Sequence, residues 1–493
     1  MQNKGNIFKF GFISLLILLS LNFKPSNSYI VLPLEYLPKS NYKFLPKEDY
    51  SDKPEIIMKE LYYKRLITYL NIGTPLKSQM MFIDTDTSRF FLTSLNPPVK
   101  SHEEPKISEF YEFGENLFYN ESESSSYKEE QCKEHDQEYK EVCFAKDQIK
   151  FNFGNYSSSF DFPIKVFKGE DERIPGMIGL AINSSIIYGT KDLISELKLY
   201  NFIKDYYYFF DIEKVSPLNS EIKGNLIIGD LPHNIFPDKY PKEEFINLKY
   251  HSGSSFWSYE MKKIQAESKT KNDIQITNTK IHTFYEFYHV IGTTDFWNEL
   301  RELFLNKLEK ENKCFLGKFS QNMYSFDDLN FYYCDISVEK ILLDNLSGIK
   351  FYPKNSNFVF ELTKDELYYK KGKYIYFNIL FFKHQYNDWI LGQIFSLKYH
   401  FVFNTDTRQI GFYKKVNFTN DDNPTNNELN GGKSNKKIWT FIIITAFIFI
   451  IIGIIIGIVI GIKFLAKRRK KKAKELVDED YDYIPKNEEN VVN

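Results

Sequence analysis

The chain has 493 residues, of which 43% are hydrophobic and 17% aromatic, so it can form two or three domain-sized units with large cores. Its formal net charge is −1, which gives no global case for nucleic-acid binding. The 35 Tyr and 46 Phe residues favour β-sheet over helix as the main secondary structure.

The amino-terminal segment, residues 1–28, has the features of a secretory signal. Lys4 and Lys9 precede an apolar run, Phe12–Leu21, which is too short to span a membrane comfortably. Small residues at alternate positions then lead to Ser28. The pattern predicts a signal peptide that is cleaved after Ser28, which would carry the rest of the chain into the secretory pathway.

The next segment, residues 29–60, contains four prolines among mixed polar residues and is predicted to be an extended leader or pro-segment. From residue 61 to residue 415 the chain alternates short aromatic and β-branched runs with Gly, Pro, Asn and Asp, which predicts a mostly-β architecture. Examples of the predicted strands are Leu66–Ile72, Met80–Ile83, Gly224–Ile228 and Phe401–Phe403. Only Lys191–Phe202 and Thr294–Glu309 have a helical pattern, and the charged stretch 101–141 is predicted to contain an exposed loop.

The chain contains four cysteines, Cys132, Cys143, Cys314 and Cys334, for which three disulfide connectivities are possible. Sequence-local pairing, Cys132 with Cys143 and Cys314 with Cys334, needs the least rearrangement in an oxidising lumen and is the connectivity that we expect. A zinc site would require closely spaced cysteines, which this sequence lacks.

Five Asn-X-Ser/Thr sequences in the part predicted to be lumenal are candidate glycosylation acceptors. They begin at Asn120, Asn155, Asn183, Asn345 and Asn417. Each is a weak signal alone, but all five lie on the side of the membrane where glycosylation occurs.

The strongest functional signal begins at Tyr69–Pro75, a strand that leads into a Gly-Thr-Pro turn. A second apolar strand then reaches Asp84-Thr85-Asp86-Thr87-Ser88. This arrangement resembles the amino-terminal lobe of the pepsin-like aspartic proteases, in which the second strand runs into Asp-Thr-Gly-Ser/Thr-Ser.

Four further segments extend the resemblance in the order and spacing of that family. They are Pro175–Ala181, Lys223–Asp230, Trp389–Phe395 and the pair Phe403-Asn404 with Ile410–Phe412. The resemblance covers roughly residues 61–415. It implies a mostly-β, bilobal pepsin-like fold with an amino-terminal lobe at 61–215 and a carboxy-terminal lobe at 216–415.

The resemblance implies a catalytic pair of aspartates, one from each lobe, that shares a proton and activates a water molecule. Each loop also needs a Thr or Ser hydroxyl that ties the loops together and a Gly that allows a tight turn. The first loop keeps Asp84 as its catalytic residue, supported by Thr85 and Thr87, but Asp86 replaces the glycine. Asp86 either relaxes the loop or supplies a further carboxylate.

The second loop should lie in Lys280–Thr293, directly before a predicted helix, and no Asp-Thr/Ser-Gly occurs there. The catalytic position falls on Phe284, Tyr285 or Glu286, depending on the register of the following apolar pair. Glu286 is the only acid of the three, so it is the weak candidate for the second carboxylate. Its extra methylene would displace that group by more than an ångström, an error that can cost about 10²-fold in rate.

Two other features bear on the site. The nearest match to the flap of the resembled family is Phe153-Gly154, in which the flap tyrosine and one glycine are missing. His282 and His289 lack a third ligand at suitable spacing, so the sequence predicts no metal site, and the resemblance implies no cofactor. A nucleophilic Ser-His-Asp or Cys-His signature is also absent from the sequence.

After the polar residues 416–437, which we expect to form a stalk, the uncharged apolar run 438–462 is long enough to cross a hydrocarbon core of about 30 Å. The basic excess follows this run, so the positive-inside rule places residues 463–493 in the cytosol, in agreement with a cleaved signal. The expected topology is type I, with one carboxy-terminal membrane helix, in the secretory or endosomal pathway or at the cell surface. Tyr481-Asp482-Tyr483-Ile484 resembles a tyrosine-based endosomal sorting signal.

Two classes of function follow from these residues. The first is a catalytically impaired or inactive homologue that binds a peptide or protein in the cleft between the lobes. The second is an active aspartic-type endopeptidase that works at acid pH and uses Asp84 with Glu286 or Asp86. The missing second aspartate favours the first class, because acid–base proton transfer typically contributes about 10²–10⁴-fold to the rate.

Overall fold

The computed structural model describes residues 29–38, 41, 53–95, 113, 117–133, 141–154, 156–168, 174–182, 192–212, 222–248, 257–268, 273–319 and 329–416. These residues fall within one compact unit of the chain, Met1–Asp421. None of the helices in these ranges is long and apolar enough to span a membrane. The predicted signal peptide, residues 1–28, and the apolar run 438–462 both lie outside the described residues.

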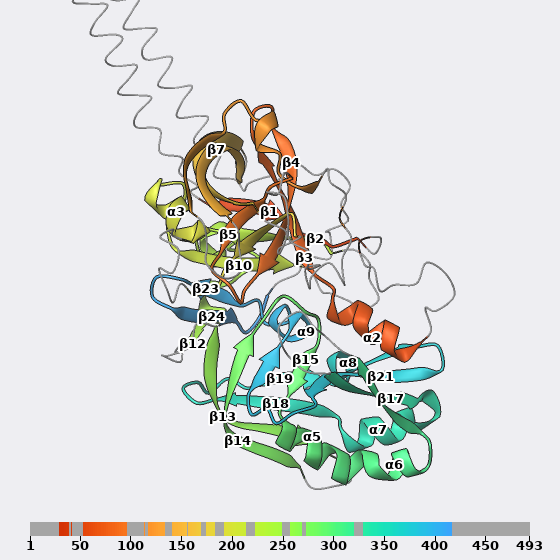
Figure 1. Ribbon diagram of the computed structural model, residues 1–493. Coiled ribbons are helices and arrows are strands. Elements are labelled where there is room, and N and C mark those ends of the chain that lie inside the picture. The colour runs from red at the N-terminus through yellow and green to blue at the C-terminus, as the bar shows by residue number, and fades with distance from the viewer. Residues whose placement is uncertain are drawn as a thin grey trace, which may run out of the picture. The chain divides into compact units, whose positions relative to one another are not determined.

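The described strands form three sheets, and the first has eight strands in the order β2-β3-β4-β9-β5-β8-β7-β6. Its strands are β2 (Glu35–Tyr36), β3 (Leu66–Ile72), β4 (Lys77–Asp84), β5 (Phe90–Thr93), β6 (Lys128–Lys133), β7 (Glu141–Phe153), β8 (Tyr156–Lys168) and β9 (Gly176–Gly179). Most neighbouring pairs are antiparallel, but β4 pairs with β9 in parallel, and β5 pairs with β8 in parallel. These strands occupy the upper part of Figure 1.

The second sheet has ten strands and follows the order β16-β17-β21-β15-β22-β14-β13-β18-β19, with β20 paired to β21. Its strands are β13 (Ser258–Glu267), β14 (Ile274–Thr283), β15 (Val290–Gly292), β16 (Cys314–Phe319), β17 (Leu329–Asp335), β18 (Gly348–Pro353), β19 (Phe360–Thr363), β20 (Tyr368–Lys371), β21 (Tyr374–Phe382) and β22 (Trp389–Leu391). Like the first sheet, it contains short parallel pairs, β14 with β22 and β15 with β21.

The third sheet has six strands in the order β1-β11-β10-β23-β24-β12 and joins segments from distant parts of the chain. They are β1 (Ile30–Pro33), β10 (Tyr207–Ile212), β11 (Gly224–Ile228), β12 (Phe245–Leu248), β23 (Val402–Asn404) and β24 (Gln409–Tyr413). Aromatic packing connects this sheet to the second predicted loop, because the ring of Phe210 stacks on that of Tyr285 with centroids 3.9 Å apart. The sheet therefore packs against the second loop through this ring pair.

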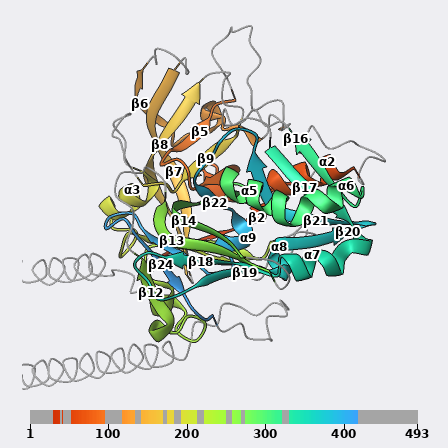
Figure 2. The same cartoon turned by 90° about the horizontal axis from the view of Figure 1, so that it is seen from below.

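Helices are short and lie at the ends of strands. They are α2 (Pro54–Tyr62), α3 (Leu193–Leu199), α4 (Pro232–Ile235), α5 (Thr294–Leu300), α6 (Asn306–Lys310), α7 (Glu339–Asn345), α8 (Lys364–Leu367) and α9 (Gln393–Ser396), with the π-helical turn η6 (Arg301–Leu305) between α5 and α6 and the 3₁₀ turns η4 (Glu121–Glu123), η5 (Lys242–Glu244) and η7 (Ile336–Val338). The hydroxyl of Thr293 caps α5 by accepting from the Phe296 N–H at 3.2 Å. Phe296 packs edge-on against Trp389 at 4.9 Å, which holds α5 on the second sheet (Figure 2).

The structure confirms most of the predicted elements. The strands predicted at Leu66–Ile72 and Gly224–Ile228 have these bounds in the structure. The predicted helix Lys191–Phe202 contains α3, and the predicted helix Thr294–Glu309 covers α5, η6 and all of α6 except its last residue, Lys310. The leader was expected to be extended, but its end forms α2, whose Ile57, Met58 and Leu61 are buried. A nine-residue helix that begins at a proline gives little periodic signal, and burial of one face stabilises it.

Both disulfides have the sequence-local connectivity that we expected. Cys132 on β6 bonds to Cys143 on β7, and Cys314 on β16 bonds to Cys334 on β17. In each case the two cysteines are directly opposite each other on antiparallel strands, so pairing of the strands brings the sulfurs together.

Candidate functional site

The first loop begins where β4 ends, at Asp84. β4 pairs in parallel with β9, and Asp84 lies opposite Gly179. A side chain at Gly179 would collide with the backbone of Thr87 and Arg89, so the close crossing of the two segments requires glycine there. Asp84 is 3% exposed, and its Oδ1 accepts from the backbone N–H groups of Asp86 at 2.8 Å and Thr87 at 2.7 Å. The loop therefore folds around this carboxylate.

The second loop repeats this geometry. β14 pairs in parallel with β22, and its last residue, Thr283, lies opposite Leu391. One residue further along both strands, Phe284 follows Thr283 and Gly392 follows Leu391. The Phe284 N–H donates to the Leu391 carbonyl at 3.0 Å, so Phe284 and Gly392 continue the register. A side chain at Gly392 would collide with the carbonyl oxygens of Phe287 and His289. A glycine thus faces the first residue of the loop in both lobes.

The hydrogen bonds of these two glycines fix the register between the loops. The Gly179 N–H donates to the carbonyl of Arg89, which is five residues after Asp84, at 2.6 Å. The Gly392 N–H donates to the carbonyl of His289, which is five residues after Phe284, at 3.0 Å. Phe284 is therefore the counterpart of Asp84 in the second loop. Of the three residues that the sequence left open, the register selects Phe284, an apolar and partly buried side chain.

Glu286 lies two positions further on, where the first loop has Asp86, and it links the two loops. Its Oε1 accepts from the Oγ1–H of Thr85 at 2.8 Å and from the backbone N–H of Thr85. Thr85 Oγ1 in turn accepts from the backbone N–H of Tyr285 at 3.1 Å. Tyr285, the counterpart of Thr85, directs its phenol toward the Ser396 carbonyl at 3.4 Å. A Glu286 oxygen therefore supplies the acceptor that a Thr or Ser at position 285 would have provided.

The three carboxyl groups of the two loops perturb one another. Burial raises the pKa of Asp84, against the hydrogen bond from Thr87 and the positive charge of Arg65. Burial, followed by the negative charge of Asp84, raises the pKa of Asp86 to about 7. Burial and the charges of Asp84 and Asp86 raise the pKa of Glu286 to about 8. The cluster therefore retains protons at pH values where isolated carboxyl groups are ionised.

Two of these carboxyl groups also have an oxygen with no hydrogen-bond partner. Oδ1 of Asp86 and Oε2 of Glu286 are both buried and unpartnered within the described part of the chain. An unpartnered buried oxygen is costly when it carries charge, which agrees with the raised pKa of both groups.

A family model of the eukaryotic aspartyl proteases matches residues 65–415. The chain belongs to this family. Comparison with curated proteins finds no match. For a eukaryotic aspartyl protease, the first loop has the expected Asp84 and Thr85, and the second loop carries Phe284 at the position equivalent to Asp84.

Three residues that contact or influence the aspartyl protease loops were not found from the sequence. Arg65 is 4% exposed and lies between α2 and β3. Its positive charge partly opposes the rise that burial causes in the pKa of all three carboxyl groups. Gln393 is fully buried, and its Nε2 donates to the carbonyls of Tyr285 and Lys64, both at 2.8 Å. Tyr36 donates to Gln393 Oε1 at 3.3 Å. The segment Trp389–Phe395 resembles the Trp-Ile-Leu-Gly-Asp-x-Phe segment of the family, in which Asp occupies the position of Gln393. This difference was the one sequence signal that could have identified Gln393.

Phe153-Gly154 is the turn that the sequence matched to the flap. Its described contacts are with residues other than those of the Asp84 loop and the Phe284 loop. Phe153 is 2% exposed and contacts the rings of Tyr156, Phe160 and Phe202. A side chain at Gly154 would meet the hydroxyl of Tyr29, next to β1. This turn thus lies near the six-stranded sheet, where β7 contacts β1.

The two histidines considered as metal ligands, His282 and His289, have separate environments. His282 Nε2 lies 3.3 Å from Asp388 Oδ2. His289 is fully buried beneath the ring of Tyr62 in α2, at a centroid distance of 6.5 Å, and burial lowers its pKa to about 3. Within the described residues, the one group of three possible metal ligands is Glu129 with Cys132 and Cys143, and its sulfurs are joined in a disulfide.

Of the predicted glycosylation acceptors, Asn120 and Asn345 are described, and Asn155, Asn183 and Asn417 lie outside the described residues. Asn120 precedes η4, where its Oδ1 accepts from the Ser122 N–H at 3.2 Å. Asn345 is the last residue of α7. Both side chains are partly exposed.

Proposed function

We propose that this eukaryotic aspartyl protease homologue is catalytically impaired or inactive and binds a peptide or protein ligand in the cleft between its lobes. The observation that carries the proposal is Phe284, the counterpart of Asp84. A phenyl ring has no proton to exchange, so Asp84 lacks the partner with which a shared-proton pair activates water. Loss of such a group removes both the acid–base contribution and the water-binding oxygen.

The role of Glu286 supports the same proposal. Its Oε1 is already engaged by two donors of Thr85, and this engagement holds the loops together. A carboxyl group that must keep this link is poorly placed to exchange protons with a substrate. Burial raises the pKa of Asp84, and the charge of Arg65 only partly opposes this rise; a guanidinium stays protonated, so Arg65 supplies no transferable proton in place of the missing carboxyl group.

A second candidate function, an acid endopeptidase that uses Asp84 with Glu286 or Asp86, rests on one observation. The charge of Asp84 raises the pKa of both Asp86 and Glu286, so the cluster could hold one carboxyl group protonated beside one that is ionised. That division of charge is what an acid–base pair requires.

We also propose that the folded part lies in the lumen or outside the cell and is attached to the membrane by the apolar run 438–462 in a type I topology. The basic residues after this run and the predicted signal at 1–28 support this orientation. Disulfides such as Cys132–Cys143 and Cys314–Cys334 are typical of oxidising compartments.

The experiment that separates the two functions is cleavage of a denatured protein substrate by the full-length protein between about pH 3 and pH 6, the acid range in which carboxyl groups of ordinary pKa change charge. Activity above that of Asp84→Asn would refute the proposal and establish the endopeptidase. Absence of cleavage by both the wild type and Asp84→Asn would support the proposal of an impaired or inactive homologue. Binding of a peptide that carries a transition-state-like hydroxyl group is measured on the same two proteins to test the cleft.

A gain-of-function variant gives a test that does not depend on the absence of cleavage. Phe284→Asp, Tyr285→Thr and Glu286→Gly together restore the second loop of the resembled family, and we expect acid proteolysis to appear in this triple variant. The matched control carries Phe284→Asn with the same two other changes. It retains the shape of the loop and lacks the second carboxyl group, so it should remain inactive.

A further inference from the structure

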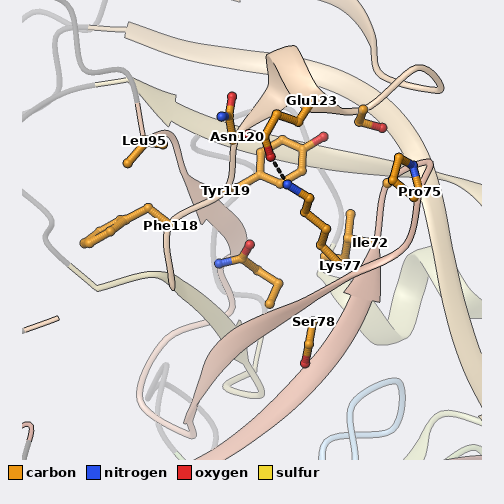
Figure 3. Close-up of a pocket in the computed structure, with 12 residues that line it drawn as sticks. Ile72, Pro75, Lys77, Ser78, Leu95, Phe118, Tyr119, Asn120 and Glu123 are labelled. Carbon is orange, nitrogen blue, oxygen red and sulfur yellow. Dashed lines mark ion pairs between the residues drawn. The ribbon is translucent and has the colours of Figure 1, made fainter. Parts of the chain in front are cut away.

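An open pocket of about 320 Å³ lies beside the turn between β3 and β4, within the range of about 300–1,000 Å³ that is common for small-molecule sites. Its walls combine apolar side chains, among them Leu95 and Phe118, with the polar groups of Lys77, Asn120 and Glu123. Figure 3 shows Asn120 beside Glu123 at one side of this pocket and the ion pair of Glu123 with Lys77 across it.

Hydrogen bonds within the protein connect the walls of the pocket to one another. The Thr74 N–H donates to Ser124 Oγ at 3.0 Å, and the Ser125 N–H donates to the Thr74 carbonyl at 2.9 Å. Ser124 Oγ also donates to Asp147 Oδ1 at 3.0 Å, and Asp147 is fully buried. These bonds fix the loop at 119–127 to the Gly-Thr-Pro turn, so the pocket is preorganised.

Asn120 begins the sequence Asn120-Glu121-Ser122 and has a defined orientation. Its Oδ1 accepts from the Ser122 N–H at 3.2 Å and from the Ser122 hydroxyl at 2.7 Å. Its Nδ2 makes no hydrogen bond to any described residue. The amide oxygen is therefore fixed, and the amide nitrogen, which is the atom that glycosylation modifies, is left available at the edge of the pocket.

We infer that this pocket is the seat of the first sugar of an N-linked glycan on Asn120. Nδ2 forms a bond to C1 of the sugar of a lipid-linked oligosaccharyl diphosphate, the bond from C1 to the phosphate oxygen breaks, and the lipid diphosphate leaves as Nδ2 loses one proton. A pyranose ring has an apolar face that fits Leu95 and Phe118, and its hydroxyl groups can bond to Lys77 and Glu123.

This inference rests on the lumenal placement in the proposed function and is independent of whether the chain is catalytic. The test uses the full-length protein made in a eukaryotic secretory host. Peptide N-glycosidase converts each glycosylated Asn to Asp, and mass spectrometry of digests made in ¹⁸O-water reports the occupancy of every acceptor. We expect Asn120 to be occupied.

Binding of the first sugar in the pocket is tested by the rate at which peptide N-glycosidase releases the glycan from the native protein. The rate of release from the denatured protein is the reference. A seated sugar must leave the pocket before the enzyme reaches its linkage, so we expect release at Asn120 to be at least about tenfold slower than at Asn345 in the native state only. Phe118→Ala should abolish the difference, and the control Tyr200→Ala, an exposed side chain outside the pocket, should leave it unchanged.

The outcomes separate this inference from the proposed function. An unmodified Asn120 in a protein that is glycosylated at other acceptors would overturn the seat and leave the lumenal placement intact. Equal rates of glycan release at Asn120 and Asn345 in the native protein would also overturn the seat and leave the lumenal placement intact. A protein with no glycan at any acceptor would overturn both.

Discussion

Replacing Glu286 with glutamine tests the assignment of this residue as the link between the loops. Gln has the shape of a protonated Glu, and its carbonyl oxygen can accept the same two bonds from Thr85. It cannot ionise, so the variant isolates the energetic consequence of the buried carboxyl group. Any constant cost of placing an NH₂ group at the unpartnered Oε2 position applies equally at every pH.

The magnitude follows from the pKa of Glu286, which rises from 4.5 in the unfolded chain to about 8 in the folded protein. The folded state holds this proton more tightly, so the stability it contributes is complete below pH 4.5 and is lost as the pH rises toward 8. Between about pH 5 and pH 7.5 this loss amounts to about 3 kcal/mol, and Glu286→Gln should not show it. Asp86, whose pKa is about 7, adds a loss of the same sign that both proteins share.

The assay is thermal or urea unfolding of the wild type and Glu286→Gln across this pH range. The free energy of unfolding of the variant relative to the wild type should rise by about 3 kcal/mol from pH 5 to pH 7.5. Glu311→Gln, at an exposed position, is the matched control and should follow the wild type. Parallel profiles for the wild type and Glu286→Gln would refute the reasoning, because they would mean that Glu286 is ionised at low cost.

Three further perturbations follow from the structure. Gly179→Ala should destabilise the first loop by about 3 kcal/mol or more, since the added carbon meets backbone that cannot move aside; an unchanged melting temperature would contradict this. His289→Phe should raise stability at pH 5 by about 2 kcal/mol and less at pH 7, because the pKa of His289 falls from 6.5 to about 3 and the wild type loses stability as the pH drops below 6.5; a pH-independent difference would count against it. Joint replacement of Cys314 and Cys334 by Ala should cost about 3 kcal/mol in urea unfolding for a loop of this length, and equal midpoints would argue against the bond.

The sequence by itself determined the fold family, the first loop and the disulfides. These features depend on local patterns: the strand that ends at Asp84, the Gly-Thr-Pro turn, and cysteines close enough in sequence to pair across neighbouring strands. The location of the second loop was also evident, because an apolar strand and a capped helix flank it.

Only the tertiary structure decided which residue of the second loop is equivalent to Asp84. That register is set by parallel pairing of β14 with β22, more than a hundred residues apart, and no local pattern distinguishes Phe284 from Tyr285 or Glu286. The link from Glu286 to Thr85 spans 201 residues and forms only when the two loops are brought together. Burial then shifts the carboxyl pKa values, because the energy of a charge depends on the protein around it rather than on its neighbours in sequence.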